Sequence, residues 1–354
     1  MNSTWIINYE PPVIYSIGIY IFINDRSRIT HMTHEKLHCL MVISNPCRYR
    51  RRYELARQFI KRMHAFEDHI ILYIVEMVYM YPQDPQDPQD PQDPEFHMTV
   101  SSDPRHLQLT APTPLWHKEN MINLGVRRLL PPDWKAMAWI DADIEFESPH
   151  WASDALRLLL GGTYDVVQLF SYAVLMNRQE QALMVTPSFA QEHVRGMAYN
   201  GIPGINFWHP GFAYAITRTL YDKMGGLLDR AICGGGDKFM AFAFTGQIES
   251  AMFHGLPESF CQYLVEYQEK MGRDIRLGYL PTVLRHYFHG DRKNRKYTER
   301  WSILTENNYN PYTHVEPNEQ GILIPSPASF PRHVGEQILQ YFQERNEDEE
   351  DNIC

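Results

Sequence analysis

A short apolar run that ends in two aspartates constrains the fold of this chain more than any other feature. Residues Ala136–Ile140 are all apolar, and Asp141-Ala142-Asp143 follows directly. So short a run is typical of a buried strand rather than of a helix. Side chains at positions i and i+2 of an extended chain point to the same side. We therefore expect Asp141 and Asp143 to face one spot at the carboxyl end of a strand, where open α/β sheets bind their ligands.

Two carboxylates held this close repel each other, so a cation is expected beside them. Hard oxygen ligands favour magnesium, manganese or calcium over zinc. The alternative interpretation is a strand that runs into an acidic, solvated turn, which is the commoner meaning of a bare Asp-x-Asp pattern. The apolar strand before the pair and the motifs elsewhere in the chain favour the metal site.

Length and composition limit the protein class. The chain of 354 residues can form one large domain or two smaller ones, and its formal net charge of -10 argues against a nucleic-acid-binding face. The five cysteines are odd in number and include no Cys-x-x-Cys pair, so a reduced, cytoplasmic setting is expected. The apolar stretch Val13–Ile23 is too short to cross a bilayer and lacks a signal-peptide start. It is expected to be a strand or hairpin added to the core, or else a weak membrane-facing piece, and no membrane span is expected.

Strands and helices alternate along the first half of the chain. This order is typical of an α/β fold with a mixed, mostly parallel central sheet flanked by helices. The aspartate pair falls in the middle of the alternation, so it should lie near the centre of the sheet. The patterns predict strands at 37–44, 70–80, 107–110, 136–140 and 164–170, and helices at about 49–64, 118–130 and 148–161.

The second half is less regular, and residues 176–208 are expected to be loops. A strand or extended segment is predicted at 277–288, and the acid run 347–351 is expected to be disordered. A further strand is predicted at 211–217, and helices at 217–226, about 234–244, 256–271, 294–307 and 333–344.

The domain organisation that follows is a single catalytic-type domain at 37–310, preceded by an extension at 1–36. Four Pro-Gln-Asp repeats and a final proline occupy 82–94. Proline at every third position excludes helix and central strand, so this segment is expected to be a surface loop within the domain. A C-terminal coil and helix at 311–345 and an acidic tail at 346–354 complete the chain.

The helix predicted at 49–64 begins with a basic cluster, Arg50-Arg51-Arg52. Positive charge at a helix N-terminus opposes the helix dipole, and a nearby anion would relieve this conflict. The alternative is an ordinary solvated basic face.

Three further positions carry candidate chemistry, each with a structural alternative. Glu76 is a lone acid in an apolar strand, so it either contacts a ligand or is held by internal hydrogen bonds. Asp237 follows three glycines at a helix start, where it can accept a proton from a hydroxyl or cap the helix. Trp208 can stack on a sugar face together with His209 and Gly211, or it belongs to the core.

Taken in order, these motifs resemble those of GT-A fold glycosyltransferases, which use nucleotide sugars. The resemblance covers roughly residues 37–310 and implies the GT-A, Rossmann-like variant of the α/β fold. It departs from some inverting members at Tyr297, which stands where their Gln-x-x-Arg-Trp motif has glutamine, so processive polymer synthesis is not expected. The motifs are Asn45-Pro46, Lys118-Glu119-Asn120 with Asn123, Asp141-Ala142-Asp143, His209-Pro210-Gly211, Gly235-Gly236-Asp237 and His289-Gly290.

The resemblance implies a metal-dependent enzyme that moves a sugar from a nucleotide diphosphate sugar, a UDP-sugar first of all, to an acceptor hydroxyl. The acceptor would be a glycan, a protein or a small molecule. Asp143 and His289 would bind Mn²⁺ or Mg²⁺, with Asp141 near the ribose or a metal-bound water, and Asp237 would be the catalytic base of an inverting transfer. The remaining donor contacts would come from Asn45, Glu76, Lys118, Trp208, His209 and Gly211.

A basic segment follows His289, with Arg292, Lys293 and Arg295. It could close over a diphosphate once the donor binds, or it could be a solvated basic turn.

Two other functions remain open from the sequence. One is a GT-A-like module that binds sugars or assembles with partners without turnover. The other is a nucleotidyltransferase, although the turn after the first strand lacks the glycine-rich basic loop that such enzymes carry.

Overall fold

A seven-stranded sheet forms the centre of the protein in a computed structural model that describes residues 35–80, 94–199 and 208–349. The predictions for residues 1–34 and for the Pro-Gln-Asp repeats up to residue 93 lie outside the described residues. Within the described ranges, each helix is too short or too polar to span a lipid bilayer.

The strand order of this sheet is β10-β6-β9-β4-β1-β2-β3, and only β9 runs antiparallel to its neighbours. The predicted α/β class with a mixed, mostly parallel sheet is thereby confirmed. β4 pairs with β1 on one side and with β9 on the other, so the aspartates that follow β4 emerge at mid-sheet. The strands are β1 (Leu37–Ser44), β2 (Ile70–Tyr79), β3 (His106–Ala111), β4 (Ala136–Ile140), β6 (Val166–Gln168), β9 (Ala213–Thr217) and β10 (Leu277–Tyr279).

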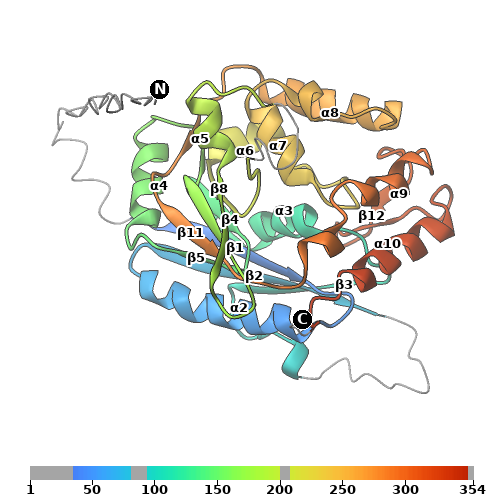
Figure 1. Ribbon diagram of the computed structural model, residues 1–354, viewed down its shortest axis with the longest axis horizontal. Helices are drawn as coiled ribbons and strands as arrows, with labels where there is room; N and C mark the ends of the chain where they lie inside the picture. The colour runs from blue at the N-terminus through green and yellow to red at the C-terminus, as the bar shows by residue number, and fades with distance from the viewer. Residues whose placement is uncertain (1–34, 81–93, 200–207, 350–354) are drawn as a thin grey trace, which may run out of the picture. The chain divides into compact units, whose positions relative to one another are not determined.

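Both faces of the sheet are covered, which is why its central strands are continuously apolar. Leu40 and Trp139 point into one core cluster, whereas Met41 and Ala138 point into the other. α2 and α4 contribute to the second cluster, and α3, α7, α8 and α10 to the first (Figure 1). These helices are α2 (Arg50–Met63), α3 (Lys118–Leu129), α4 (Trp151–Leu160), α7 (Gly236–Phe244), α8 (Glu258–Met271) and α10 (Arg332–Glu344), with α6 (Arg218–Met224) beside β9.

A second sheet of four strands, in the order β5-β11-β7-β8, was missed by the sequence patterns. Loops were expected over 176–208, which is wrong for β8 and for α5 (Phe189–Val194). The segment predicted at 277–288 divides into β10 and β11, which belong to different sheets. The strands are β5 (Ile144–Phe146), β7 (Tyr172–Met176), β8 (Ala182–Pro187) and β11 (Val283–His286).

The helix predicted at 294–307 is broken into 3₁₀ turns at Arg292–Arg295 and Glu299–Trp301 and a short α9 (Ser302–Thr305). Lys296 separates the two turns in a left-handed conformation with φ of 44°. A small hairpin of β12 (Val315–Pro317) and β13 (Leu323–Pro325) leads to α10.

The expectation of disorder from residue 347 onward is wrong for Glu347, which is only 1% exposed. The chain beyond α10 returns to the N-terminus of α2, where both carboxylate oxygens of Asp348 accept hydrogen bonds, at 2.9 Å each, from the N–H groups of Arg50 and Arg51. α2 has no capping side chain of its own. The anion that the basic start of this helix requires therefore comes from the C-terminal segment.

Candidate functional site

A cavity of about 440 Å³ opens at the carboxyl ends of β1 and β4. Its lining joins residues from α3, from the turn after β4, from the start of α7 and from the segment after β11. The cavity therefore unites parts of the chain that are far apart in sequence. Six of the predicted site residues lie in this lining, namely Lys118, Asp141, Asp143, His209, Asp237 and His289.

Asp143, His286 and His289 form a group that fits a metal ion. One ligand atom from each residue lies within 4.8 Å of the other two. The Nε2 atom of His289 is 2.8 Å from Oδ2 of Asp143, and Nε2 of His286 is 3.7 Å from Oδ1. That Oδ1 atom is buried and has no hydrogen-bond partner among the described residues. A buried carboxylate oxygen without a partner is costly, so the group is suited to a divalent cation.

The second sheet explains why these three residues meet. β5 pairs antiparallel with β11, so that Ile144 lies opposite His286. The N–H of Tyr287 donates to the carbonyl oxygen of Asp143 at 2.8 Å, which fixes the backbone between the two histidines beside the aspartate. The sequence motifs pointed to His289 alone, whereas the pairing of β5 with β11 makes both histidines neighbours of Asp143.

The charge states of the group suit metal binding. Burial alone would raise the pKa of Asp143, but His289 and His286 outweigh burial and hold that pKa well below its usual range. Burial lowers the pKa of His286 to about 3, against the opposing influence of Asp143. The carboxylate is therefore ionised and the His286 imidazole neutral at physiological pH, and these are the forms that bind metals.

Lys118 places a positive charge beside the second aspartate. It begins α3, and its Nζ atom forms an ion pair with Oδ1 of Asp141. Burial would lower the pKa of Lys118, but Asp141 and Glu119 overcome this and raise it, so the lysine stays charged. Burial also raises the pKa of Glu119 to about 8, although Lys118 opposes the shift.

Asp237 lies in the first turn of α7, and the N-cap of that helix is Gly235. Gly235 has φ of 84°, and a Cβ there would meet the Trp301 ring at 2.6 Å, so the turn requires glycine. The Oδ1 atom of Asp237 accepts a hydrogen bond from the N–H of Lys238 at 2.8 Å. Because Gly235 holds the capping position, the alternative that Asp237 is the N-cap is wrong.

The segment before β9 lies beside both the metal-binding group and Asp237, since Phe212 contacts His286 and Gly211 adjoins Asp237. The His209 and Phe212 rings stack with their centroids 3.6 Å apart. Phe212 has φ of 75°, an uncommon conformation for a bulky residue, and such strain concentrates at functional sites. Burial lowers the pKa of His209 well below its usual value, so this imidazole is neutral.

Three predicted contacts lie outside the cavity lining and have structural partners. The Asn45 side chain bonds to the backbone of Tyr49 and closes the turn after β1. Glu76 is fully buried and accepts hydrogen bonds from the N–H groups of Met98 and Thr99 at 3.0 Å. Trp208 packs against Phe189 and Tyr199 in the core. Gly211 is not part of the lining but lies beside Asp237.

Five arginines line the cavity. Of the basic segment after His289, Arg292 and Arg295 line the cavity, whereas the side chain of Lys293 is 77% exposed. The basic start of α2 pointed to an anion near Arg52. The sequence did not identify that anion, which is the Glu347 carboxylate. Arginines from three other parts of the chain also line the cavity, namely Arg52, Arg300 and Arg345.

No protein-family model and no curated protein matches this chain. Solved structures are similar to it at low identity. The catalytic domain of Drosophila β1,4-galactosyltransferase 7 in complex with xylobiose has 10% identity and a TM-score of 0.36, covering 82% of this chain and 93% of that one. A mutant of the same Drosophila enzyme, in complex with manganese, UDP-Gal and xylobiose, gives the same values.

Two bacterial structures are also similar. A putative nucleotide-diphospho-sugar transferase from Desulfovibrio desulfuricans has 12% identity and a TM-score of 0.30, covering 77% of this chain and 96% of that one. The 4-diphosphocytidyl-2C-methyl-D-erythritol synthase of Anaerococcus prevotii has 11% identity and a TM-score of 0.29, covering 71% and 89%. TM-scores this low mark a distant likeness only.

Proposed function

We propose that this protein is a metal-dependent glycosyltransferase that moves a sugar from a nucleotide diphosphate sugar, a UDP-sugar first of all, to an acceptor hydroxyl. One observation carries the proposal. A single cavity contains a group suited to a divalent ion, a charged lysine paired with a second aspartate, and a separate carboxylate on another helix. Its volume of about 440 Å³ falls in the range of small-molecule sites.

Asp143, His286 and His289 are the residues that would hold the ion. Imidazole and carboxylate together suit Mn²⁺ better than Mg²⁺, which prefers a shell of oxygen atoms. The ion, when bound, stabilises the negative charge that builds on the diphosphate as the bond to the sugar breaks.

The cationic side chains of the cavity would bind and orient the diphosphate. Lys118 is already charged beside Asp141, and its ammonium can contact a phosphate oxygen as well. Arg292 and Arg295 line the same cavity on the segment that follows His289. Asp141, fixed by Lys118, can accept a hydrogen bond from a ribose hydroxyl.

Asp237 is the residue that would remove the acceptor proton. In the proposed step the bond between the anomeric carbon and the phosphate oxygen breaks, and a bond from that carbon to the acceptor oxygen forms. The acceptor proton passes to Asp237, and the nucleoside diphosphate leaves with the bonding electrons. An apolar part of the lining, which includes Leu175, Met176 and Leu183, suits the apolar face of an acceptor.

The test is a screen of nucleotide sugars with the purified chain and Mn²⁺, with nucleoside diphosphate and pyrophosphate measured separately. The proposal expects nucleoside diphosphate release that a chelator abolishes. Pyrophosphate release from a nucleoside triphosphate would instead indicate nucleotidyl transfer. Donor binding without turnover on any donor would indicate a binding module.

A further inference from the structure

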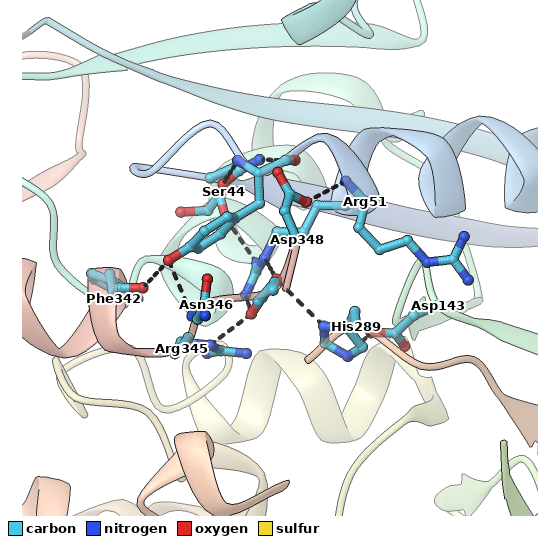
Figure 2. Close-up of polar contacts among 12 residues, drawn as sticks. Ser44, Arg51, Asp143, His289, Phe342, Arg345, Asn346 and Asp348 are labelled. Atoms are coloured by element: carbon cyan, nitrogen blue, oxygen red, sulfur yellow. Dashed lines mark hydrogen bonds and ion pairs between the residues drawn. The ribbon is translucent and has the colours of Figure 1, made fainter. Parts of the chain in front are cut away.

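Glu347 approaches the metal-site histidine on the side of the ring away from the metal position. Its Oε2 atom is 3.4 Å from Nδ1 of His289, while Nε2 of the same ring is 2.8 Å from Oδ2 of Asp143. Figure 2 shows His289 with Asp143 on one side and the segment that contains Arg345 on the other. The imidazole thus lies between two carboxylates, one from the turn after β4 and one from beyond α10.

The Glu347 carboxylate is held firmly in place. Its side chain is fully buried, and Arg52 approaches both oxygens, with Nη2 2.7 Å from Oε1. Nε of Arg345 also lies 2.7 Å from Oε1. The two hydrogen bonds from Arg52 therefore fix the orientation of this carboxylate before any ligand binds, and the charge of Arg345 lies beside it.

The backbone around Glu347 is anchored independently of its side chain. Asp348 binds the N-terminus of α2. The hydroxyl of Tyr49 donates to the carbonyl oxygens of Phe342 and Gln343 at 3.0 and 2.7 Å. Gly290, next to His289, has φ of 90°, and a Cβ there would lie 3.1 Å from Cα of Glu347. The close approach of the two segments therefore does not depend on the Glu347 carboxylate.

One other charged group contacts the His289 ring. Nη2 of Arg295 lies 2.9 Å from Nδ1 and 2.8 Å from Nε2. Arginine can only donate hydrogen bonds, so Arg295 can pair only with the ring nitrogen that lacks a proton and cannot accept a hydrogen bond from Nδ1–H. Within the described residues, Glu347 supplies the acceptor recorded near that atom.

We propose that Glu347 is a positioning residue of the metal site. It accepts a hydrogen bond from Nδ1–H of His289, so that the lone pair of Nε2 points toward Asp143 and the ion. Partners of this kind fix the tautomer and the orientation of a metal-binding histidine and raise its basicity. This inference rests on the metal site that underlies the proposed function.

The experiment measures Mn²⁺ affinity by calorimetry in E347Q, without donor or turnover. The position of Oε1 faces donors from two arginines and that of Oε2 faces a donor from Arg52 alone, so the glutamine oxygen would take the Oε1 position. The amide nitrogen would then face Nδ1 and favour the wrong tautomer of His289. Loss of such a partner typically weakens metal binding by about 10 to 100-fold, which is the expected effect. D348N is the matched control, because it alters the same segment without contacting His289; it should retain wild-type Mn²⁺ affinity.

A double-mutant cycle separates positioning from general support. In the H289A background, E347Q should cause no further loss of Mn²⁺ affinity. If E347Q does not fold, the double variant R52M/E347Q replaces it, because this variant lacks one buried charge of each sign. The difference in Mn²⁺ affinity between R52M and R52M/E347Q then measures the contribution of Glu347. Wild-type affinity in a folded E347Q protein, or an equal loss with and without His289, would overturn the positioning role. Absence of Mn²⁺ binding by the wild-type chain would instead overturn the metal site and the proposed function with it.

Discussion

Gly211 leaves the space that Asp237 occupies, since a Cβ at residue 211 would lie 2.4 Å from Oδ2 of Asp237. That distance is about 1 Å shorter than an ordinary Cβ contact, so an added methyl group must displace the carboxylate. The two residues come from different parts of the fold, the segment before β9 and the start of α7.

The first prediction follows from this contact. G211A should lower kcat about 100-fold, because a displacement of about 1 Å at a reacting group costs about that much, while donor affinity changes little. The measurement is steady-state kinetics together with donor titration. G335A is the control, because a Cβ at Gly335 makes its nearest contact at an ordinary 3.6 Å. Wild-type kcat in G211A would show that the position of Asp237 is unimportant.

Asp237 itself gives the second prediction. D237N should bind the donor and Mn²⁺ as the wild type does but transfer sugar about 10² to 10⁴-fold more slowly, since the amide cannot accept the acceptor proton. Single-turnover assays with a competent acceptor would measure this. Transfer at the wild-type rate would remove Asp237 from the role of base.

The third prediction concerns the group of Asp143, His286 and His289 that fits a metal ion. D143A should abolish Mn²⁺ binding and nucleoside diphosphate release, and H286A should weaken Mn²⁺ binding at least about 10-fold, because each removes one atom of the group. H209A is a matched control, since His209 lines the same cavity but does not belong to the group. If H286A and H209A bind Mn²⁺ equally well, His286 is not a ligand.

Glu119 gives a prediction for pH. Burial, opposed by Lys118, raises the pKa of Glu119 from the usual 4.5 to about 8 in the folded protein. The folded state therefore retains a proton that the unfolded state loses, so stability should fall as pH rises from about 5 to 8. The slope reaches at most about 1.4 kcal/mol per pH unit.

Urea unfolding of wild type and E119Q between pH 5 and 8 checks this expectation. The amide cannot ionise, so the curve of E119Q against pH should be flatter than that of the wild type. Exposed Glu316 supplies the control E316Q, which should keep the wild-type slope. Parallel curves for E119Q and wild type would contradict the shift.

Asp348 gives a prediction for stability. D348A removes the acceptor for two N–H groups of α2, which has no other capping side chain, so it should cost about 1 kcal/mol of unfolding free energy. Chemical denaturation measures this. D348N should lose less, because asparagine is a comparable capping residue. An unchanged unfolding free energy in D348A would show that the contact contributes nothing.

The first half of the fold could be predicted because each of its elements carries its own periodicity. The predicted strand at 37–44 and helix at 118–130 agree with β1 and α3 to within a residue. β5 and β11 are too short to leave a pattern, and they gain stability only by pairing residues that are far apart, such as Phe146 with Leu284. Local patterns cannot report such pairings.

Glu347 shows a second limit of local patterns. An acid run is usually solvated, and nothing within a few residues of Glu347 contradicts that expectation. The contact that buries it comes from Arg52, which is 295 residues away. One sequence feature did indicate the contact. The cluster of positive charge at the start of α2 is unfavourable without an anion nearby, but local patterns could not show that Glu347 is that anion.

The distance along the chain between Arg52 and Glu347 has a consequence for synthesis. A ribosome that has completed the large sheet has not yet exposed the residue that bridges Arg52 and His289. Nascent chains should therefore acquire their α/β architecture well before the orientation of His289 is complete. If His289 holds manganese as proposed, early release products that stop just short of residue 347 should retain the ion poorly.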